Sequence, residues 1–222
     1  MTPNAIACSD WRLYVIIDRA TVKARDLAEV AEAAIRGGAD VLQLRDKAAS
    51  DDTLIEEARR LLRLTRGAGI PLIINDRPEV ARAIGAEGVH LGQADLPLSV
   101  ARRRLGPSAI LGRSTHSLAQ ARAAEADGAD YIGCGPVFAT PTKPEYAGVG
   151  LGLIAEVDSQ VRVPLVCIGG IDQTTLPQVL AAGATRVAVV RAICGAADPE
   201  AAARALKHAL TQGSRANAAP PL

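Results

Sequence analysis

The segment GGADVLQLR (residues 37–45) carries the main signal for the fold, because it joins a helix end to a buried strand and has three counterparts. The counterparts are GAEGVHLG (85–92), GADYIGCG (128–135) and GATRVAVVR (183–191). Each begins with a glycine that suits a helix C-cap and continues with aliphatic residues typical of a buried parallel strand. The polar residue at the far end of the strand differs between copies. This pattern predicts an enzyme barrel whose chemistry collects at one rim.

Strand and helix patterns alternate from residue 12 to about residue 212. The predicted strands cover residues 13–18, 41–45, 72–75, 88–91, 110–112, 131–134, 165–168 and 186–189. The predicted helices cover residues 25–36, 52–65, 79–84, 98–105, 118–127, 151–158, 175–181 and 199–210. Near-equal βα units favour a closed (β/α)₈ TIM barrel. A doubly wound open sheet is the alternative, since the same alternation forms either fold.

The chain is expected to form one domain. No linker divides it, so residues 1–212 are assigned to a single catalytic barrel. Residues 213–222 (GSRANAAPPL) have almost no core-forming side chains, and we expect them to be disordered. The Pro- and Gly-rich segment 135–150 is the longest unusual loop, and such loops inside compact domains are often functional.

Composition excludes several classes of partner. The 222-residue chain has a formal net charge of +1 and 2% aromatic residues, which argues against a nucleic-acid partner. Its start lacks a secretory signal and its apolar runs are too short to span a bilayer, so a cytoplasmic protein without a membrane partner is expected. The cysteines have no CxxC spacing and are predicted to be buried thiols: Cys8, Cys134, Cys167 and Cys194.

Basic and amide side chains follow the second predicted strand. Gln43, Arg45 and Lys47 alternate, so an extended chain would point all three to one face. Two inward cations would be costly without an anion to meet them. The alternative places Lys47 in a solvated loop and pairs Arg45 with a nearby carboxylate.

Two aspartates end the third and fourth predicted strands. Asp76 and Asp95 each stand shortly before a helix, so each alone could be an ordinary N-cap. Together, at adjacent strand ends beside Arg45 and Lys47, they suit a site for Mg²⁺ and a diphosphate. Magnesium prefers one or two carboxylates together with phosphate oxygens and water.

Hydroxyl side chains follow the fifth and sixth predicted strands. Ser114 and Thr115 precede a helix that they could cap, and His116 is either a proton carrier or a structural donor, with the structural role favoured. A nucleophilic serine is not expected, because no GxSxG turn is present. In the long loop, Thr140, Thr142 and Lys143 offer hydroxyls and a cation for a phosphate, although a Pro-rich turn also needs polar residues.

The last two predicted strands end in a phosphate-binding pattern. Gly169-Gly170 opens a helix and lets backbone amides approach an anion, although the glycines could also form only a tight turn. Val190-Arg191 precedes another short helix. In TIM barrels these two loops commonly bind phosphate. Two phosphate regions are therefore predicted, one with metal and one without, as two phosphorylated substrates would require.

Taken as a set, these motifs resemble the thiamine phosphate synthase family over residues 11–210. QLRDK (43–47), Asn75-Asp76, HLGQADLP (90–97), GPVFATPTK (135–143) and IGGI (168–171) recur in the family's order and spacing. The resemblance implies that hydroxymethylpyrimidine diphosphate and hydroxyethylthiazole phosphate are joined with release of diphosphate. It implies Mg²⁺ at Asp76 and Asp95, and catalytic roles for Arg45, Lys47, Ser114 and Lys143.

The resemblance also implies a set of substrate-binding residues. They are Gln43, Leu44, Arg45, Asp46, Lys47, Asn75, Ser114, Thr140, Pro141, Thr142, Lys143, Gly170, Val190 and Arg191. Arg191 departs from the serine often found in the family, and Ile16-Ile17-Asp18 lacks the hydroxyl residue common before the aspartate. Monomer and homo-oligomer are both left open.

A dissociative mechanism is expected, because no strong base or nucleophile stands among these residues. Magnesium and the basic groups would stabilise the departing diphosphate, and the thiazole nitrogen would capture the pyrimidine carbocation. One rival function is a thiazole tautomerase of the same fold, in which His116 would be central. The other is a phosphate-ligand sensor without turnover, in which the paired carboxylates would lack a purpose.

Overall fold

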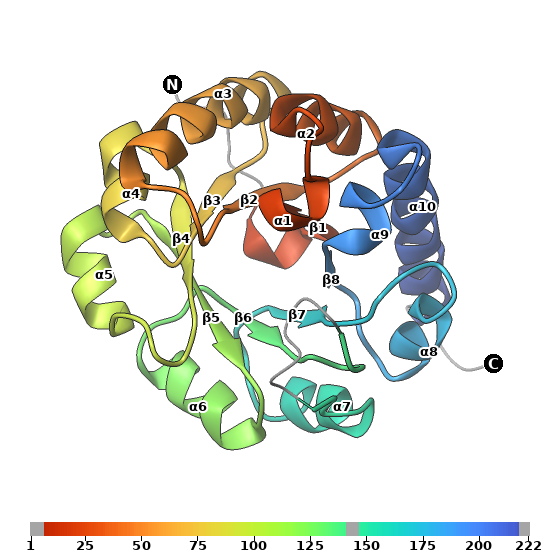
Figure 1. The fold of residues 1–222 in the computed structure, drawn as a ribbon. Coiled ribbons are helices and arrows are strands. Elements are labelled where there is room, and N and C mark those ends of the chain that lie inside the picture. Colours follow the sequence, from red (N-terminus) through yellow and green to blue (C-terminus); the bar gives the residue numbers. More distant parts are fainter. Residues whose placement is uncertain (1–6, 141–146, 218–222) are drawn as a thin grey trace.

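The fold is a closed barrel of eight parallel strands, each paired with the next and the last with the first (Figure 1). The structure is a computed structural model that describes residues 7–140 and 147–217. The strands are β1 (Leu13–Asp18), β2 (Val41–Arg45), β3 (Leu72–Asn75), β4 (Gly88–Leu91), β5 (Ile110–Thr115), β6 (Tyr131–Cys134), β7 (Leu165–Ile168) and β8 (Val187–Val189). The TIM-barrel prediction is confirmed, and the open-sheet alternative is wrong.

The longer helices form a ring outside the strands, while α1 and α9 lie inside that ring (Figure 1). The helices are η1 (Cys8–Asp10), α1 (Arg19–Val22), α2 (Leu27–Arg36), α3 (Asp51–Ala68), α4 (Pro78–Ile84), α5 (Leu98–Leu105), α6 (Leu118–Ala126), α7 (Gly152–Asp158), α8 (Leu176–Ala181), α9 (Arg191–Cys194) and α10 (Pro199–Asn217). Sequence patterns did not predict η1 and α1, which are too short to show a period.

Helix α10 is longer than predicted. It continues to Asn217, past Gly213, where the disordered tail was expected to begin. Gly213 lies against α8, since a Cβ added there would come within 3.0 Å of Leu180. Extending an existing helix costs little compared with starting one, so polar residues suffice for another turn. Residues 218–222 of the expected tail lie outside the described part of the chain.

The repeated glycine step behaves as its sequence indicates. Gly38, Gly85, Gly128 and Gly183 all have positive φ, between 68° and 99°. In the first copy the left-handed residue is the second glycine. Gly37 instead allows α2 and α10 to meet, because a Cβ there would lie 2.4 Å from that of Ala203.

Strand alternation divides the apolar residues into two cores. One fills the space between the strands and the outer helices. The other lies inside the barrel and includes Trp11, Tyr14 and Tyr131. Trp11 lies just before β1. Its ring contacts the Tyr14 and Tyr131 rings edge-on, with centroids 5.7 and 5.1 Å away. Aromatic packing therefore fills the amino-terminal part of the barrel and leaves the carboxyl ends of the strands for a cavity.

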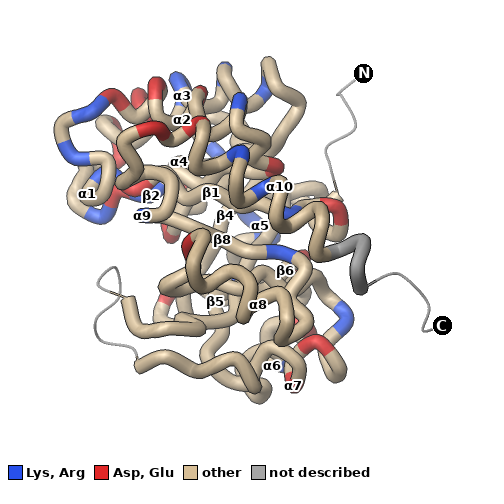
Figure 2. The backbone as a smooth tube through the Cα atoms, turned by 90° about the vertical axis from the view of Figure 1, so that its right-hand side faces the viewer, with Lys and Arg blue, Asp and Glu red and all other residues tan. Residues whose placement is uncertain are grey.

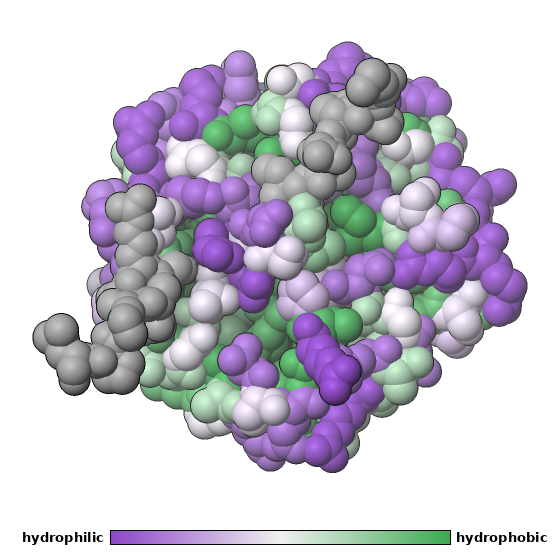
Figure 3. Space-filling view, turned by 180° about the vertical axis from the view of Figure 1, so that it is seen from behind, coloured by the Kyte–Doolittle hydropathy of each residue, from purple (hydrophilic) through white to green (hydrophobic). Residues whose placement is uncertain are grey.

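The surface does not favour one sign of charge on the side seen in Figure 2, where Lys and Arg are interspersed with Asp and Glu along the upper helices. Seen from behind, hydrophilic side chains surround smaller hydrophobic areas (Figure 3). Among the described residues, no helix combines the length and apolar character needed to cross a membrane.

Candidate functional site

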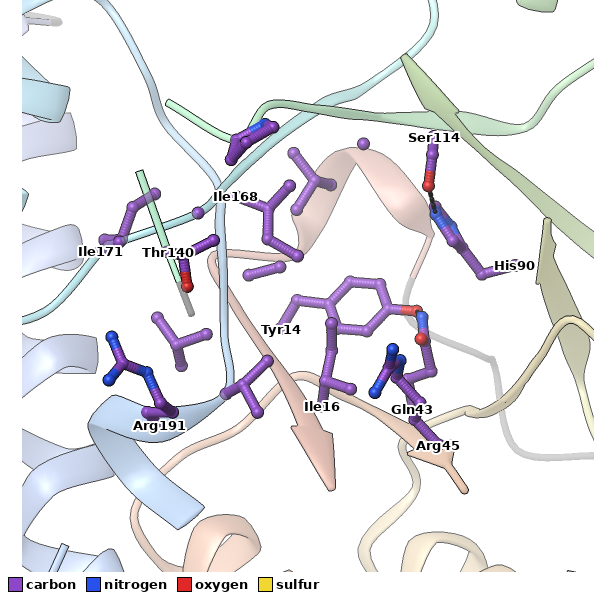
Figure 4. A pocket seen from close by; sticks show the side chains of 18 of the residues that line it. Tyr14, Ile16, Gln43, Arg45, His90, Ser114, Thr140, Ile168, Ile171 and Arg191 are labelled. Atoms are coloured by element: carbon purple, nitrogen blue, oxygen red, sulfur yellow. Dashed lines mark hydrogen bonds between the residues drawn. The ribbon is translucent and has the colours of Figure 1, made fainter. Parts of the chain in front are cut away.

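A cavity of about 310 Å³ opens at the carboxyl ends of the strands (Figure 4). Every strand contributes at least one lining residue, as in a TIM barrel whose rim carries the chemistry. The volume lies at the lower end of the range for small-molecule sites. Eight of the predicted substrate-binding residues line it: Gln43, Arg45, Asn75, Ser114, Thr140, Gly170, Val190 and Arg191.

Other predicted residues lie elsewhere. Leu44 is fully buried in the outer core, because strand alternation turns it away from the lumen. The Asp46 carboxylate accepts hydrogen bonds from the amides of Ala48 and Ala49 at 2.9 and 3.1 Å, so it orders its own loop. Neither residue lines the cavity, and a substrate-binding role for either stays a prediction. Pro141, Thr142 and Lys143 lie outside the described residues.

Both hypotheses for the end of β2 hold in part. Gln43 and Arg45 face the cavity, and Arg45 also forms an ion pair with Asp18. Lys47 lies beyond the strand with its side chain 62% exposed, and its Nζ is 3.6 Å from Asp76 Oδ2. The amide and one cation therefore point inward, while the second cation stays at the solvated rim beside a carboxylate.

Asp18 is a site residue that sequence patterns did not single out. It is 2% exposed, and it is the register partner of Arg45 on the neighbouring strand. Its Oδ1 also accepts hydrogen bonds from the amide and hydroxyl of Thr21 at 2.9 and 3.0 Å, which caps α1. The sequence did contain a signal for this pair: β1 is apolar and ends in an aspartate, and the next strand ends in an arginine.

The Asp76 and Asp95 carboxylates face each other, and neither is a helix N-cap. Arg77 and Pro97 occupy the N-cap positions of α4 and α5, so the capping hypothesis is wrong for both aspartates. Asp76 has a φ of 61°, rare for a residue with a side chain. Burial first, and then the Asp95 carboxylate, raise the pKa of Asp76, while Lys47 lowers it.

The surroundings of this pair contain few other ligands. The Asp95 carboxylate accepts a hydrogen bond from the Gly92 amide at 2.6 Å. Within residues 7–140 and 147–217, no group of three or more His, Cys, Asp or Glu side chains could hold a metal. The two carboxylates thus lie at the rim, beside the cavity rather than within its lining.

Hydrogen-bonded side chains connect Gln43 to Ser114 through the barrel interior. Gln43 Nε2 donates to the Tyr14 hydroxyl at 2.7 Å, and the Tyr14 and Tyr131 hydroxyls are 2.8 Å apart. The Tyr131 hydroxyl lies 2.9 Å from His90 Nδ1, and His90 Nε2 lies 2.9 Å from Ser114 Oγ, a contact drawn in Figure 4. Tyr14, Tyr131 and His90 were missed, because nothing in the sequence indicates that residues so far apart meet.

The hydroxyl residues after β5 have separate roles. Ser114 faces the cavity, whereas Thr115 is buried and donates to the Gly133 carbonyl at 3.1 Å. The cap of α6 is Ser117, whose hydroxyl accepts from the Gln120 amide at 3.3 Å. His116 lines the cavity, and its Nδ1 contacts the Gly135 carbonyl. That backbone contact agrees with the favoured structural role of His116.

The far side of the cavity combines glycines with a cation. Gly170 has a φ of 65°, and a Cβ there would lie 2.7 Å from that of Phe138. Only glycine therefore allows the backbone at residue 170 to lie so close to Phe138. Arg191 begins α9 and forms no ion pair with a described residue. Figure 4 shows Arg191 and Thr140 on one side of the cavity and Gln43, Arg45 and Ser114 on the other.

The thiols offer no nucleophile. All four cysteines are free, and Cys134, Cys167 and Cys194 are buried. Burial raises the pKa of Cys134 to about 11 and that of Cys194 to about 12. A thiol in this state does not form the thiolate that attack requires.

An eight-stranded parallel barrel with a cavity at its carboxyl rim defines an enzyme of the TIM-barrel class. The family model described as thiamine monophosphate synthase matches residues 13–193. The chain belongs to this family, and it is a transferase.

Individual relatives agree with that assignment. The chain is 50% identical over 199 residues to the thiamine-phosphate synthase of Chloroflexus aurantiacus, covering 89% of this chain and 92% of that one. It is 46% identical over 206 residues to that of Shouchella clausii, covering 92% and 99%. The solved thiamine phosphate pyrophosphorylase of Pyrococcus furiosus is 35% identical, with a TM-score of 0.85 and coverage of 93% and 98%.

Proposed function

We propose that this protein joins hydroxymethylpyrimidine diphosphate to hydroxyethylthiazole phosphate and releases diphosphate. The observation that carries the proposal is the placement of basic side chains on two sides of the site. Arg45, Lys47 and the acidic pair stand on one side, and Arg191 with the Gly169-Gly170 turn stands on the other. Two phosphorylated substrates, one on each side, would bring their rings together in the apolar middle of the cavity.

The first side would bind the pyrimidine diphosphate. Gln43 and Ser114 are polar groups placed to meet a heteroaromatic ring, while Arg45 and Asn75 reach the rim where a diphosphate would lie. Lys47 stands further out, and Lys143, which the family resemblance also assigns here, lies outside the described residues. Arg45 and Lys47 already contact carboxylates, so an incoming diphosphate would share these cations with Asp18 and Asp76.

The acidic pair would bind Mg²⁺. Two facing carboxylates with one lysine nearby carry an excess of negative charge, and the pKa of Asp76 is raised first by burial and then by the Asp95 carboxylate. A divalent cation would offset that repulsion, and two carboxylates with phosphate oxygens and water form the ligand set that magnesium prefers. When bound, the ion would stabilise negative charge on the leaving diphosphate.

The second side would bind the thiazole phosphate. Thr140, Gly170 and Val190 line this part of the cavity, and the Arg191 guanidinium offers charged donors to a phosphate. Thr142 and Pro141 of the same assignment lie outside the described residues.

The residues support a dissociative course. The buried cysteines are protonated, and the Ser114 hydroxyl contacts an imidazole whose other ring nitrogen lies 2.9 Å from the Tyr131 hydroxyl. Arg45 would hold the departing diphosphate while the electron-rich aminopyrimidine supports a cationic methylene. The thiazole nitrogen then forms the new C–N bond, and the diphosphate keeps the electron pair of the broken C–O bond. Catalysis is mainly positioning and electrostatic stabilisation.

The test is turnover of both substrates by the full chain, with Mg²⁺ or with EDTA. Diphosphate and thiamine phosphate are expected in equal amounts, and only when both substrates and Mg²⁺ are present. Isomerisation of the thiazole compound without diphosphate release would overturn the proposal in favour of a tautomerase. Binding of both phosphates without turnover would overturn it in favour of a sensor.

A further inference from the structure

The hydrogen bonds of the interior chain from Gln43 to Ser114 are coupled, because the donor at one contact decides the donor at the next. Burial raises the pKa of both Tyr14 and Tyr131, so each hydroxyl keeps its proton. Each tyrosine therefore has one proton to donate. With Gln43 donating to Tyr14, the Tyr14 proton goes to Tyr131 and the Tyr131 proton goes to His90 Nδ1.

The state of His90 and Ser114 follows from this order. Since Nδ1 accepts, the neutral imidazole has its proton on Nε2, which donates to Ser114 Oγ. The serine proton is then directed away from His90, and Ser114 lines the cavity. Ser114 thus offers an O–H donor to a bound ligand.

The other end of the chain offers an acceptor. Gln43 Oε1 accepts no hydrogen bond from a described residue, yet among those residues no buried side-chain oxygen lacks a partner. The oxygen is therefore open to the cavity that Gln43 lines. Figure 4 shows the Gln43 amide beside the Tyr14 hydroxyl, at the edge of that space.

Two glycines make room for this chain. Gly112 is in register with both His90 and Tyr131, and a Cβ there would come within 2.4 Å of His90 Nδ1 and of the Tyr131 hydroxyl. A Cβ at Gly133 would lie 3.2 Å from the His90 ring. Any larger residue at Gly112 would separate the two groups whose contact sets the imidazole tautomer.

We propose that Tyr14, Tyr131 and His90 are positioning residues that fix Gln43 as an acceptor and Ser114 as a donor toward the cavity. A ring with an exocyclic amino group would donate to Gln43 Oε1, whereas an oxo group at the same position would meet that oxygen with its own lone pairs. With Gln43 Nε2 donating to Tyr14, the chain favours an amino-substituted ring over its oxo analogue. This inference rests on the proposed function, which supplies an aminopyrimidine.

The opposite direction of the same chain explains why the tyrosines matter. If the Gln43 amide turned over, Tyr14 would donate to it, Tyr131 to Tyr14, His90 Nδ1 to Tyr131 and Ser114 to His90 Nε2. The cavity would then present an NH₂ group and a serine lone pair, which suit an oxo ring. A buried unpaired group is costly, so the intermediate groups force both ends to change together.

The experiment compares kcat/KM for the amino and 4-oxo forms of the pyrimidine diphosphate. In Tyr131→Phe, which alters neither Gln43 nor Ser114 directly, the amino/oxo ratio is expected to fall about tenfold or more. Trp11→Phe is the matched control, because Trp11 packs on both tyrosine rings without joining the chain. In a Gln43→Ala background, Tyr131→Phe should leave the ratio unchanged.

The outcomes separate the two proposals. Absence of diphosphate release from the unaltered protein would contradict the proposed function. An active protein whose Tyr131→Phe and Tyr14→Phe variants keep the original ratio would contradict the positioning role alone. Nitrogen-15 NMR of the unaltered protein needs no variant to fold: a proton on His90 Nε2 is expected, and a proton on Nδ1 would overturn the assigned direction.

Discussion

Arg45 and Asp18 form an ion pair across the ends of β2 and β1. The cation that faces the cavity is therefore oriented by a carboxylate that is only 2% exposed. Removing one partner of a buried pair leaves the other charge uncompensated. Asp18→Asn should therefore lower the free energy of unfolding by about 3 kcal/mol. It should also raise KM for the pyrimidine diphosphate. Urea denaturation and steady-state kinetics measure both effects.

The control for that change is Glu32→Gln, another acid-to-amide substitution. Glu32 pairs with Arg36 at 3.4 Å, but both side chains are more than half exposed. Its effect on unfolding should stay within about 0.5 kcal/mol. Equal effects of the two substitutions would show that the Asp18 pair has no special role.

Asp76→Ala and Asp95→Ala should each lower kcat at saturating Mg²⁺ about 100-fold, because charge stabilisation on the leaving diphosphate is lost. The concentration of Mg²⁺ needed for half-maximal rate should rise. Exposed Asp52 in the first turn of α3 provides the control, and Asp52→Ala should leave both quantities unchanged. Wild-type rates with ordinary Mg²⁺ dependence in both variants would remove the metal assignment.

Arg191→Ser tests the second anion side. A guanidinium–phosphate contact is charge-assisted, so KM for the thiazole phosphate should rise about tenfold. KM for the pyrimidine diphosphate should change little, because Arg191 lies across the cavity from Gln43 and Arg45 (Figure 4). Both KM values are measured by varying one substrate at a time. Equal increases in the two KM values would show that Arg191 supports the structure of the whole site rather than one phosphate.

The buried and partly buried thiols make the free energy of unfolding depend on alkaline pH. Burial raises the pKa of Cys8 to about 12, Cys134 to about 11 and Cys194 to about 12, above the ordinary value of 9.0. Above pH 9 the unfolded chain loses thiol protons that the folded chain keeps, so the free energy of unfolding falls as pH rises. The stability that these thiols contribute is fully retained below pH 9.

Denaturation between pH 8 and about pH 11 measures this slope. Cys134→Ala should make it shallower, because one group with different pKa values in the two states is removed. A slope identical to that of the parent protein would show that Cys134 titrates equally in both states.

Two helix-end glycines, Gly37 after α2 and Gly128 after α6, have different costs of substitution. Gly37→Ala drives a methyl group to 2.4 Å from the Ala203 Cβ, so α2 and α10 must separate. We expect a loss of about 3 kcal/mol, the scale of severe overpacking. Gly128→Ala meets nothing within 4 Å and should lose only about 1 kcal/mol, the cost of its left-handed backbone. Thermal denaturation that ranks them in reverse would contradict this reading of the helix contact.

The sequence was sufficient for the barrel because both its signals are local. Glycine at positive φ and an apolar run at fixed spacing recur at Gly85 and Gly128, and each copy forms the predicted helix-to-strand step. Strand alternation likewise predicted that Gln43 and Arg45 face the cavity. The same alternation turns Leu44 into the outer core, and Asp46 lies beyond the strand, where alternation no longer decides the direction of a side chain.

The interior of the site could not be predicted in the same way. The Tyr14 and Tyr131 hydroxyls meet across 117 residues of sequence, and neither residue interrupts its strand pattern. The cap positions of α4 and α5 were also ambiguous, since an aspartate shortly before a proline indicates an N-cap as readily as a metal ligand.

The Tyr14–Tyr131 contact has a mechanical consequence. It joins β1 to β6, which are not neighbours in the wall, so it crosses the lumen as a strut. A ring of strands linked only to its neighbours can flatten toward an oval cross-section, whereas a strut resists that distortion. The separation between the two sides of the cavity is then set by the diameter of the barrel itself, so two rings brought to opposite walls would face each other across a fixed gap.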